Sequence, residues 1–357
     1  MTYAEQLLSK DVFERIMKSA HHEEGDRVPI WDFIDSAPIY EKFAPGDKNP
    51  VTATAKVFKG LGIDLCRSVY LPVQEEEVRA AQQGDVTHAV EGATRWLTNR
   101  TLKTGEDLRK LDLTPPSVED IEADEIPAFR QAQEIFAPEV MYLPCIGIGL
   151  DISYYLMGLV NFSYCLADDF EAAMSFFDYH NQVSLARAKA FAKHNLTPIA
   201  FIYDDIAYKG SLLFSPDFMR KEWLPRLKKI IEPLANAGQI IIFHSDGYLM
   251  DILDDMIDAG INGLNPIEPL AGMDIGYLKR RYGDRLILVG NVDCSQLLPF
   301  GTVEDVRQAV KECLRAAGEG GGLFIGSSSE IVPSTPVENI FAFYEACREY
   351  GKYPLKL

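Results

Sequence analysis

A histidine and a carboxylate lie two residues apart at the end of an apolar run. The run IIIF (240–243) is followed by HSDG (244–247), and a second apolar run ends near Asn265 and Glu268. An imidazole and a carboxyl group at this spacing can exchange protons or hold a divalent cation. The pattern therefore indicates acid–base or metal chemistry at His244 and Asp246. His244 could equally be a core histidine that bonds a backbone carbonyl, and Asp246 could cap the helix that follows.

Eight apolar runs of strand length are spread along the chain, and helical patterns such as 215–238 and 302–320 separate most of them. The runs are 28–34, 64–71, 141–149, 198–204, 239–244, 261–267, 286–292 and 322–328. Their near-continuous hydrophobicity is typical of parallel strands that are covered on both faces. The alternation predicts a closed (βα)8 TIM-type barrel formed by residues 1–357 as a single domain. An open doubly wound sheet is the alternative, but no G-x-G-x-x-G follows the first run.

One segment departs from the alternation. Residues 80–118 show polar/apolar alternation around a glycine turn, which predicts a β-hairpin inserted between the second and third strands. An insertion at this point can act as a lid over the barrel mouth, meet a partner, or serve as decoration.

Polar residues follow most of the predicted strands, and in a barrel these strand ends meet at one mouth. They are Asp32, Asp35, Tyr70, Cys145, Tyr203, Asp204, Asp205, His244, Asp246, Asn265, Glu268, Asn291, Ser327, Ser328, Ser329 and Glu330. Each has a structural alternative: the aspartates as helix caps, Asn291 as a turn residue, the serines as a plain loop or an anion cradle. Their coincidence at one end favours an active site at the mouth.

Charge and composition exclude several classes of protein. The chain has a formal net charge of −18, which disfavours nucleic acid as a partner. No run approaches the ~18 apolar residues of a membrane helix, and no signal sequence begins the chain, so a cytoplasmic protein is expected. The six cysteines are scattered without a C-x-x-C pair, which predicts reduced thiols and excludes a cysteine-rich zinc site.

Four stretches together carry a family resemblance. They are HSDGYLMDILDDMIDAGINGLNPIEP (244–269), LKRRYGDRLILVGNVD (278–293), GTVEDVRQAVKECL (301–314) and STPVENIFAFYEACREYGKY (334–353). In these the chain resembles the uroporphyrinogen decarboxylase superfamily, which implies a (βα)8 barrel, often dimeric. Two activities occur in that superfamily: tetrapyrrole decarboxylation, and methyl transfer to or from a corrinoid protein, often with zinc in the mouth.

The decarboxylase branch carries an R-Q-A-G-R signature after its first strand, which binds substrate carboxylates. The corresponding stretch here, RVPIWDFIDSAPIYEKF (27–43), keeps Arg27 and places Asp32 and Asp35 beyond it. A rim with these carboxylates would repel a substrate with eight carboxylates. Decarboxylation of uroporphyrinogen is therefore disfavoured.

The methyltransferase branch that acts on thiols has H-x-C after the fifth strand and a cysteine after the eighth. His244 matches the histidine, whereas Asp246 and the pair Ser329–Glu330 stand at the cysteine positions. Soft thiolate ligands suit thiol chemistry, and harder oxygen ligands suit an oxygen atom. The H-S-D-G version resembles the demethylating methyltransferases, which transfer the methyl group of an aryl methyl ether to the Co(I) corrinoid of a carrier protein.

That resemblance implies roles for the strand-end residues. Asp246, assisted by His244 and Asp205, would protonate the phenolate leaving group. Zinc held by His244, Asp246 and Glu330 is the alternative. The remaining strand-end side chains would surround a small aromatic substrate, and these are Trp31, Tyr70, Tyr203, Tyr248, Asn265 and Asn291. Other corrinoid-linked methyltransferases with thiol, amine or alcohol substrates, a decarboxylase and an inactive corrinoid-protein binding module stay as alternatives.

Overall fold

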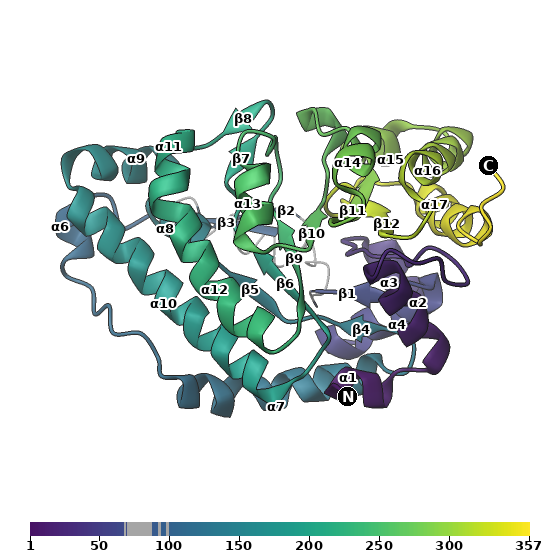
Figure 1. The fold of residues 1–357 in the computed structure, drawn as a ribbon, viewed down its shortest axis with the longest axis horizontal. Coiled ribbons are helices and arrows are strands. Elements are labelled where there is room, and N and C mark those ends of the chain that lie inside the picture. The colour runs from purple at the N-terminus through teal and green to yellow at the C-terminus, as the bar shows by residue number, and fades with distance from the viewer. Residues whose placement is uncertain (68, 70–87, 92–93, 98–99) are drawn as a thin grey trace.

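Eight parallel strand segments form a closed ring in the computed structural model, which describes residues 1–67, 69, 88–91, 94–97 and 100–357 (Figure 1). Residues 28–34 are one segment, and they join the ring through the bridges Ile30–Ile325 and Trp31–Leu65. The other segments are β1 (Leu65–Cys66), β4 (Met141–Tyr142) with β5 (Cys145–Gly147), β6 (Ile199–Tyr203), β9 (Ile240–His244), β10 (Gly263–Asn265), β11 (Ile287–Val292) and β12 (Leu323–Ser327). The predicted barrel is confirmed.

The third predicted strand is divided into β4, which pairs with β1, and β5, which pairs with β6. Pro144 lies between them and has no N–H to donate, although its carbonyl oxygen accepts a hydrogen bond from Phe201 at 3.0 Å. The ring therefore stays continuous where the strand is interrupted.

Helices cover the outside of the ring (Figure 1). They are α3 (Ala37–Phe43), α4 (Pro50–Leu61), α6 (Gly105–Leu108), α7 (Val118–Phe136), α8 (Leu150–Met157), α9 (Leu159–Asp168), α10 (Phe170–His194), α11 (Pro216–Phe218), a π turn (Met219–Trp223), α12 (Leu224–Asn236), α13 (Leu253–Ala259), a 3-10 turn (Pro269–Ala271), α14 (Ile275–Tyr282), α15 (Leu297–Phe300), α16 (Val303–Ala317) and α17 (Val337–Tyr350). The predicted helix starts are observed. Ser215 caps α11, and Thr302 forms a capping box with Asp305 at α16.

Apolar side chains fill the lower barrel interior. The inward set from the strands includes Trp31, Leu65, Met141, Leu143, Ile199, Phe201, Ile242, Ile287, Val289 and Phe324. Helices α1 (Tyr3–Leu7) and α2 (Lys10–Ala20) pack their apolar side chains against the same cluster. The N-terminal end of the barrel is thus closed, so a site must lie at the other end, where the strands finish.

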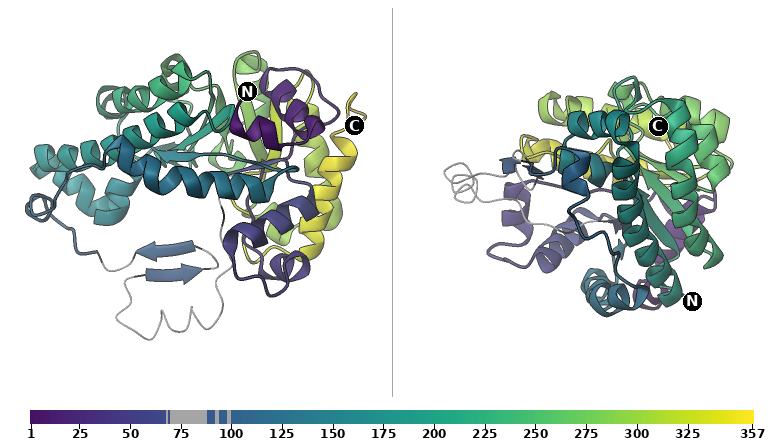
Figure 2. Two further views of the ribbon diagram at one scale, coloured as in Figure 1. Left: turned by 90° about the horizontal axis from the view of Figure 1, so that it is seen from below. Right: turned by 90° about the vertical axis from the view of Figure 1, so that its left-hand side faces the viewer.

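The predicted insertion contains an antiparallel pair, β2 (His88–Glu91) and β3 (Thr94–Leu97), which lies apart from the barrel strands (Figure 2). A second small pair, β7 (Ala207–Tyr208) and β8 (Ser211–Leu212), follows β6. The role of 80–118 as a lid stays a prediction, and Tyr70 lies outside the described residues. None of the helices in the described part of the chain is long and apolar enough to cross a membrane.

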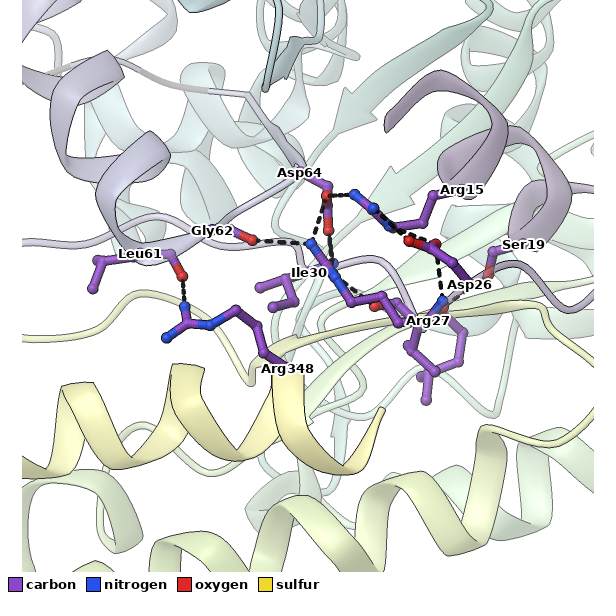
Figure 3. Close-up of polar contacts among 11 residues, drawn as sticks. Arg15, Ser19, Asp26, Arg27, Ile30, Leu61, Gly62, Asp64 and Arg348 are labelled. Carbon is purple, nitrogen blue, oxygen red and sulfur yellow. Dashed lines mark hydrogen bonds and ion pairs between the residues drawn. The ribbon is translucent and has the colours of Figure 1, made fainter. Parts of the chain in front are cut away.

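An ion network lies where β1 begins, at the closed end of the barrel (Figure 3). The buried carboxylate of Asp64 accepts hydrogen bonds from Arg15, from both terminal nitrogens of Arg27 and from the backbone N–H of Ile30, at 2.7–2.9 Å. Arg15 also binds Asp26. Arg27, the arginine retained from the decarboxylase signature, is therefore a structural residue at the end away from the mouth.

Candidate active site

Strand register places four inward positions at one level of the barrel. Gly147 pairs with Tyr203, Tyr203 with His244, and His244 with Asn265. Phe201 and Ile242 belong to the interior cluster, so alternation along the strands also turns Tyr203 and His244 inward. Because all are the last residues of their strands, they lie at the top of the interior, facing the mouth.

The imidazole of His244 has a defined orientation. Its Nδ1 lies 2.6 Å from Oδ1 of Asn265, whose amide nitrogen donates to the Val289 carbonyl oxygen at 3.4 Å. The amide oxygen therefore faces the histidine, so Nδ1 carries the proton and Nε2 keeps its lone pair. Burial and the positive charge of Arg67 lower the pKa of His244 to about 4. At neutral pH the site holds a neutral imidazole with a free acceptor nitrogen.

Two carboxylates lie on the free side of this imidazole. Nε2 of His244 is 3.8 Å from Oδ1 of Asp205, which also accepts the backbone N–H of Asp246 at 3.2 Å. Donor atoms of His244, Asp205 and Asp246 all lie within 4.8 Å of one another. One nitrogen and two carboxylate oxygens at this separation can hold a divalent cation or share a proton. We call these three residues the His–Asp–Asp cluster.

Asp246 is set up to hold a proton. Burial, followed by the negative charges of Asp205 and Glu268, raises the pKa of Asp246 to about 7, and a hydrogen bond from Ser329 acts in the opposite direction. Its Oδ1 atom is buried and has no hydrogen-bond partner within the described residues. Asp205, by contrast, is 45% exposed. The two carboxylates therefore differ in environment, and Asp246 is the better acid at neutral pH.

The loop after β9 fixes the position of Asp246. Gly247 has φ of +94°, and a Cβ atom there would lie 2.5 Å from the backbone nitrogen of Tyr208, so only glycine fits. The N–H of Gly247 donates to Glu268, and Ser245 joins the loop to β6 by accepting the N–H of Ile206. These contacts hold the carboxyl group against Asp205.

Asp204 has a structural role, although it neighbours Asp205. Its buried carboxylate accepts the backbone N–H groups of Leu150 and Asp151 at the start of α8, and the indole N–H of Trp223. Helix capping was one of the roles predicted for Asp204. The helix that it caps is α8, which precedes β6 in the chain. Burial and the charge of Asp204 raise the pKa of Asp151 well above its ordinary value.

A pocket of about 380 Å³ lies beside the cluster, between the ends of β5 and β6 and the helices α8 and α10. Asp205 forms part of its wall, together with Asp151 and His180. Its aromatic lining is Tyr154, Tyr155 and Tyr203. The volume and the aromatic walls suit a single substituted ring.

Several predicted substrate residues lie at different depths. Trp31 is fully buried and stacks on Phe201 with 4.9 Å between ring centroids. Tyr248 is half-buried near Gly272, and Asn291 is the last residue but one of β11, where it pairs with Gly326. Of the predicted residues that the structure describes, only Tyr203 lines the pocket, and Asn265 accepts a hydrogen bond from His244. Substrate contact by the others stays a prediction.

The third predicted metal ligand is not in the cluster. Glu330 is absent from the group formed by the described residues, and Asp205 completes it instead. Burial raises the pKa of Tyr40, and the negative charge of Glu330 adds to that shift.

The expectation that Asp32 and Asp35 make the rim negative is wrong, because both are buried. Asp32 accepts hydrogen bonds from Ser327 and from the hydroxyl of Tyr344. Ser327 therefore links the end of β12 to Asp32. The hydroxyl of Ser328 accepts the backbone N–H of Cys294 and donates to its sulfur.

Arg67 is a residue of the mouth that the strand-end argument passed over. It follows β1 immediately, and its guanidinium carbon lies 4.7 Å from the ring centroid of Phe33 and 4.9 Å from that of Phe201. Alternation could have identified it, since Leu65 faces the interior and the residue two positions on faces the same way.

The comparisons with known proteins agree on one family. Residues 88–350 match the family model described as uroporphyrinogen decarboxylase (URO-D). A solved methyltransferase from Methanosarcina mazei superposes with a TM-score of 0.69 at 22% identity, covering 95% of this chain and 98% of that one. This likeness confirms the barrel fold.

Curated relatives match shorter stretches. A methylcobamide:CoM methyltransferase MtaA from Methanosarcina barkeri is 33% identical over 51% of this chain and 50% of its own length. A methylated-thiol–coenzyme M methyltransferase from Methanosarcina mazei is 24% identical over 58% of this chain and 53% of its own. A uroporphyrinogen decarboxylase from Coxiella burnetii is 39% identical over 22% and 21%. The chain spans about half the length of the curated methyltransferases it matches.

Proposed function

Since the chain belongs to the uroporphyrinogen decarboxylase family, as its motifs predicted, we propose that it transfers a methyl group from an aryl methyl ether to the Co(I) corrinoid of a carrier protein. The observation that carries this proposal is the His–Asp–Asp cluster, which offers nitrogen and oxygen donors and a proton at the barrel mouth. The corrinoid partner is supported by relatives whose names include methylcobamide.

The reaction breaks the bond between the methyl carbon and the ether oxygen. The Co(I) corrinoid supplies the electron pair for the new bond to carbon, so the protein needs no nucleophile of its own. The ether oxygen keeps the electrons of the broken bond and leaves as a phenolate, whose conjugate acid has a pKa near 10. A proton delivered to that oxygen during bond breaking lowers the barrier.

Asp246 is the group that supplies the proton. It is protonated near neutral pH because it is buried beside Asp205 and Glu268. His244 stays neutral, so it adds no positive charge that would promote loss of that proton. Asp205, which lines the pocket, accepts the backbone N–H of Asp246.

The same residues fit a zinc ion. The lone pair on Nε2 of His244 points to Asp205, and Oδ1 of Asp246 is buried without a partner in the described structure. His244, Asp205 and Asp246 would hold the ion, with positions left for a substrate. Bound there, zinc would supply Lewis acidity to the ether oxygen in place of a proton.

A thiol substrate is the second candidate, because several relatives are named for coenzyme M. Against it, no cysteine of the described residues joins the cluster. Thiolate ligands favour zinc sites that activate a thiol, and carboxylate ligands make a harder site that favours oxygen. The donor set therefore supports an oxygen leaving group.

The test combines the purified protein with a Co(I) corrinoid carrier and an aryl methyl ether, and follows the corrinoid spectrum together with release of the phenol. Methylated corrinoid and phenol should form in equal amounts. The Asp246→Asn variant should react about 10²- to 10⁴-fold more slowly, whereas Asp251→Asn, which changes an exposed carboxylate in the same loop, should keep the wild-type rate. Absence of phenol with every ether would overturn the proposal.

A further inference from the structure

Arg67 places a positive charge in the upper barrel interior. It follows β1, and its guanidinium lies over the rings of Phe33 and Phe201. Phe201 in turn has its ring centroid 5.8 Å from that of His244. The cation is therefore separated by a single aromatic ring from the imidazole of the His–Asp–Asp cluster.

This guanidinium has little to bind within the described protein. One terminal nitrogen lies 3.9 Å from the sulfur of Cys145, and Nε is buried without a hydrogen-bond partner in the described structure. Among ion pairs of the described residues, Arg27 binds Asp64 and Arg226 binds Asp178, but none includes Arg67. The rings of Phe33 and Phe201 flank the guanidinium, but they provide no oxygen acceptor for its N–H groups.

The guanidinium of arginine carries a positive charge and offers N–H donors but no acceptor. A partly buried charge without a partner is unfavourable, and an anion would remove that penalty. The acids of the mouth do not do so, although the positive charge of Arg67 is felt at both His244 and Asp246. The vacant hydrogen-bonding positions thus call for an anionic group from outside the described chain.

We propose that Arg67 binds a carboxylate of the methyl donor, so that the substrates are aryl methyl ethers that carry an acid group, such as methoxybenzoates. This inference rests on the proposed function for the identity of the donor. The N–H groups of a guanidinium lie in its plane, where a planar carboxylate can accept two of them in parallel. The carboxylate and the ring of a benzoate lie close to one plane and can extend from the guanidinium.

Charge gives a second reason for an acidic substrate to need this residue. The mouth contains Asp205, Asp246 and Glu268, and the chain carries a formal net charge of −18. These carboxylates would repel a monoanionic donor. Under this proposal Arg67 offsets that repulsion by pairing with the carboxylate of the donor.

Binding is the direct test, because it needs neither corrinoid nor turnover. The full chain is titrated with 3-methoxybenzoate and with the neutral 3-methoxybenzamide by calorimetry. The wild-type protein should bind the carboxylate at least about tenfold more tightly than the amide. Arg67→Met should weaken carboxylate binding by about ten- to hundredfold and leave amide binding within about twofold. Arg67→Lys should retain part of the preference.

The control is Lys209→Met, which removes one positive charge from the exposed turn between β7 and β8 at the same mouth. It should change neither affinity. Thermal unfolding should show Arg67→Met at or above the wild-type midpoint, since the substitution removes a charge that has no carboxylate partner among the described residues.

Equal affinity of the wild-type protein for the two ligands, or equal loss of both in Arg67→Met, would overturn the inference. If the carboxylate preference depends on Arg67 while no ether is demethylated, the proposed function fails and the anion site stands. If ethers are demethylated without any preference for the acid group, the proposed function stands and the anion site at Arg67 fails.

Discussion

The sharpest consequence of the site geometry concerns the proton on Asp246. In the Asp246→Asn variant the side chain keeps its size and its ability to hydrogen-bond, but it loses the transferable proton. General acid catalysis by a positioned carboxyl group typically contributes about 10²- to 10⁴-fold in rate, so kcat should fall by that factor. Affinity for the ether should change little, because the pocket walls are unaltered.

The pH dependence follows from the same environment. Burial and neighbouring negative charges raise the pKa of Asp246 to about 7, so the acid form predominates below that pH. Methyl transfer by the metal-free protein should be constant below pH 6 and should fall about tenfold per pH unit above pH 7. At pH 9 about one carboxyl group in a hundred would hold its proton. The Asp246→Asn variant should lack this alkaline decline.

A second substitution tests the cause of the shift. Asp205 contributes negative charge that raises the pKa of Asp246, so Asp205→Asn should lower that pKa and move the alkaline decline to lower pH. The assay is initial rate of phenol release across pH 5–9 with saturating corrinoid carrier. A rate that rises through pH 7 would show that the carboxylate form is required, and it would refute the role of Asp246 as an acid.

Three further outcomes are expected from the structure. Calorimetry with zinc should give about one bound ion per chain, and His244→Ala should abolish it, whereas unchanged binding would place the ion elsewhere. Asn265→Leu removes the acceptor that fixes the imidazole, so it should weaken zinc binding by about ten- to hundredfold while the fold, followed by circular dichroism, is retained. Asp64→Ala leaves Arg27 without a carboxylate partner at the closed end of the barrel, and should lower the free energy of unfolding in urea by about 3–5 kcal/mol; a change below 1 kcal/mol would contradict this.

Much of the barrel could be predicted because a strand covered on both faces leaves a continuous apolar signature. The run 239–244 corresponds to β9 at Ile240–His244, and 322–328 corresponds to β12. The first run, 28–34, joins the ring only through isolated bridges. The third is divided where Pro144 removes a donor. These details depend on pairing between distant segments, which apolar patterns do not specify.

The candidate site was predicted only in part, because some of its contacts also join segments that are distant in the sequence. His244 and Asp246 were found because they end a strand, but which side of the strand each residue faces decides its role. Asp204 faces outward and caps α8, whereas Asp205 faces the imidazole. Leu65 of β1 faces the barrel interior, so alternation also turns Arg67 inward. Arg67, and not Asp32, was therefore the charged residue to expect at the mouth. The burial of Asp32 was not predictable, because its partners come from β12 and α17.

We propose that hard donors at the barrel mouth select oxygen as the leaving atom. The most direct measurement compares 3-methoxybenzoate with 3-(methylthio)benzoate, a pair that differs only in the atom bearing the methyl group, as donors to the Co(I) corrinoid carrier. Mass spectrometry of the demethylated products gives the two rates. The His–Asp–Asp cluster predicts that the oxygen compound reacts at least about tenfold faster. Equal rates, or faster transfer from sulfur, would contradict the claim.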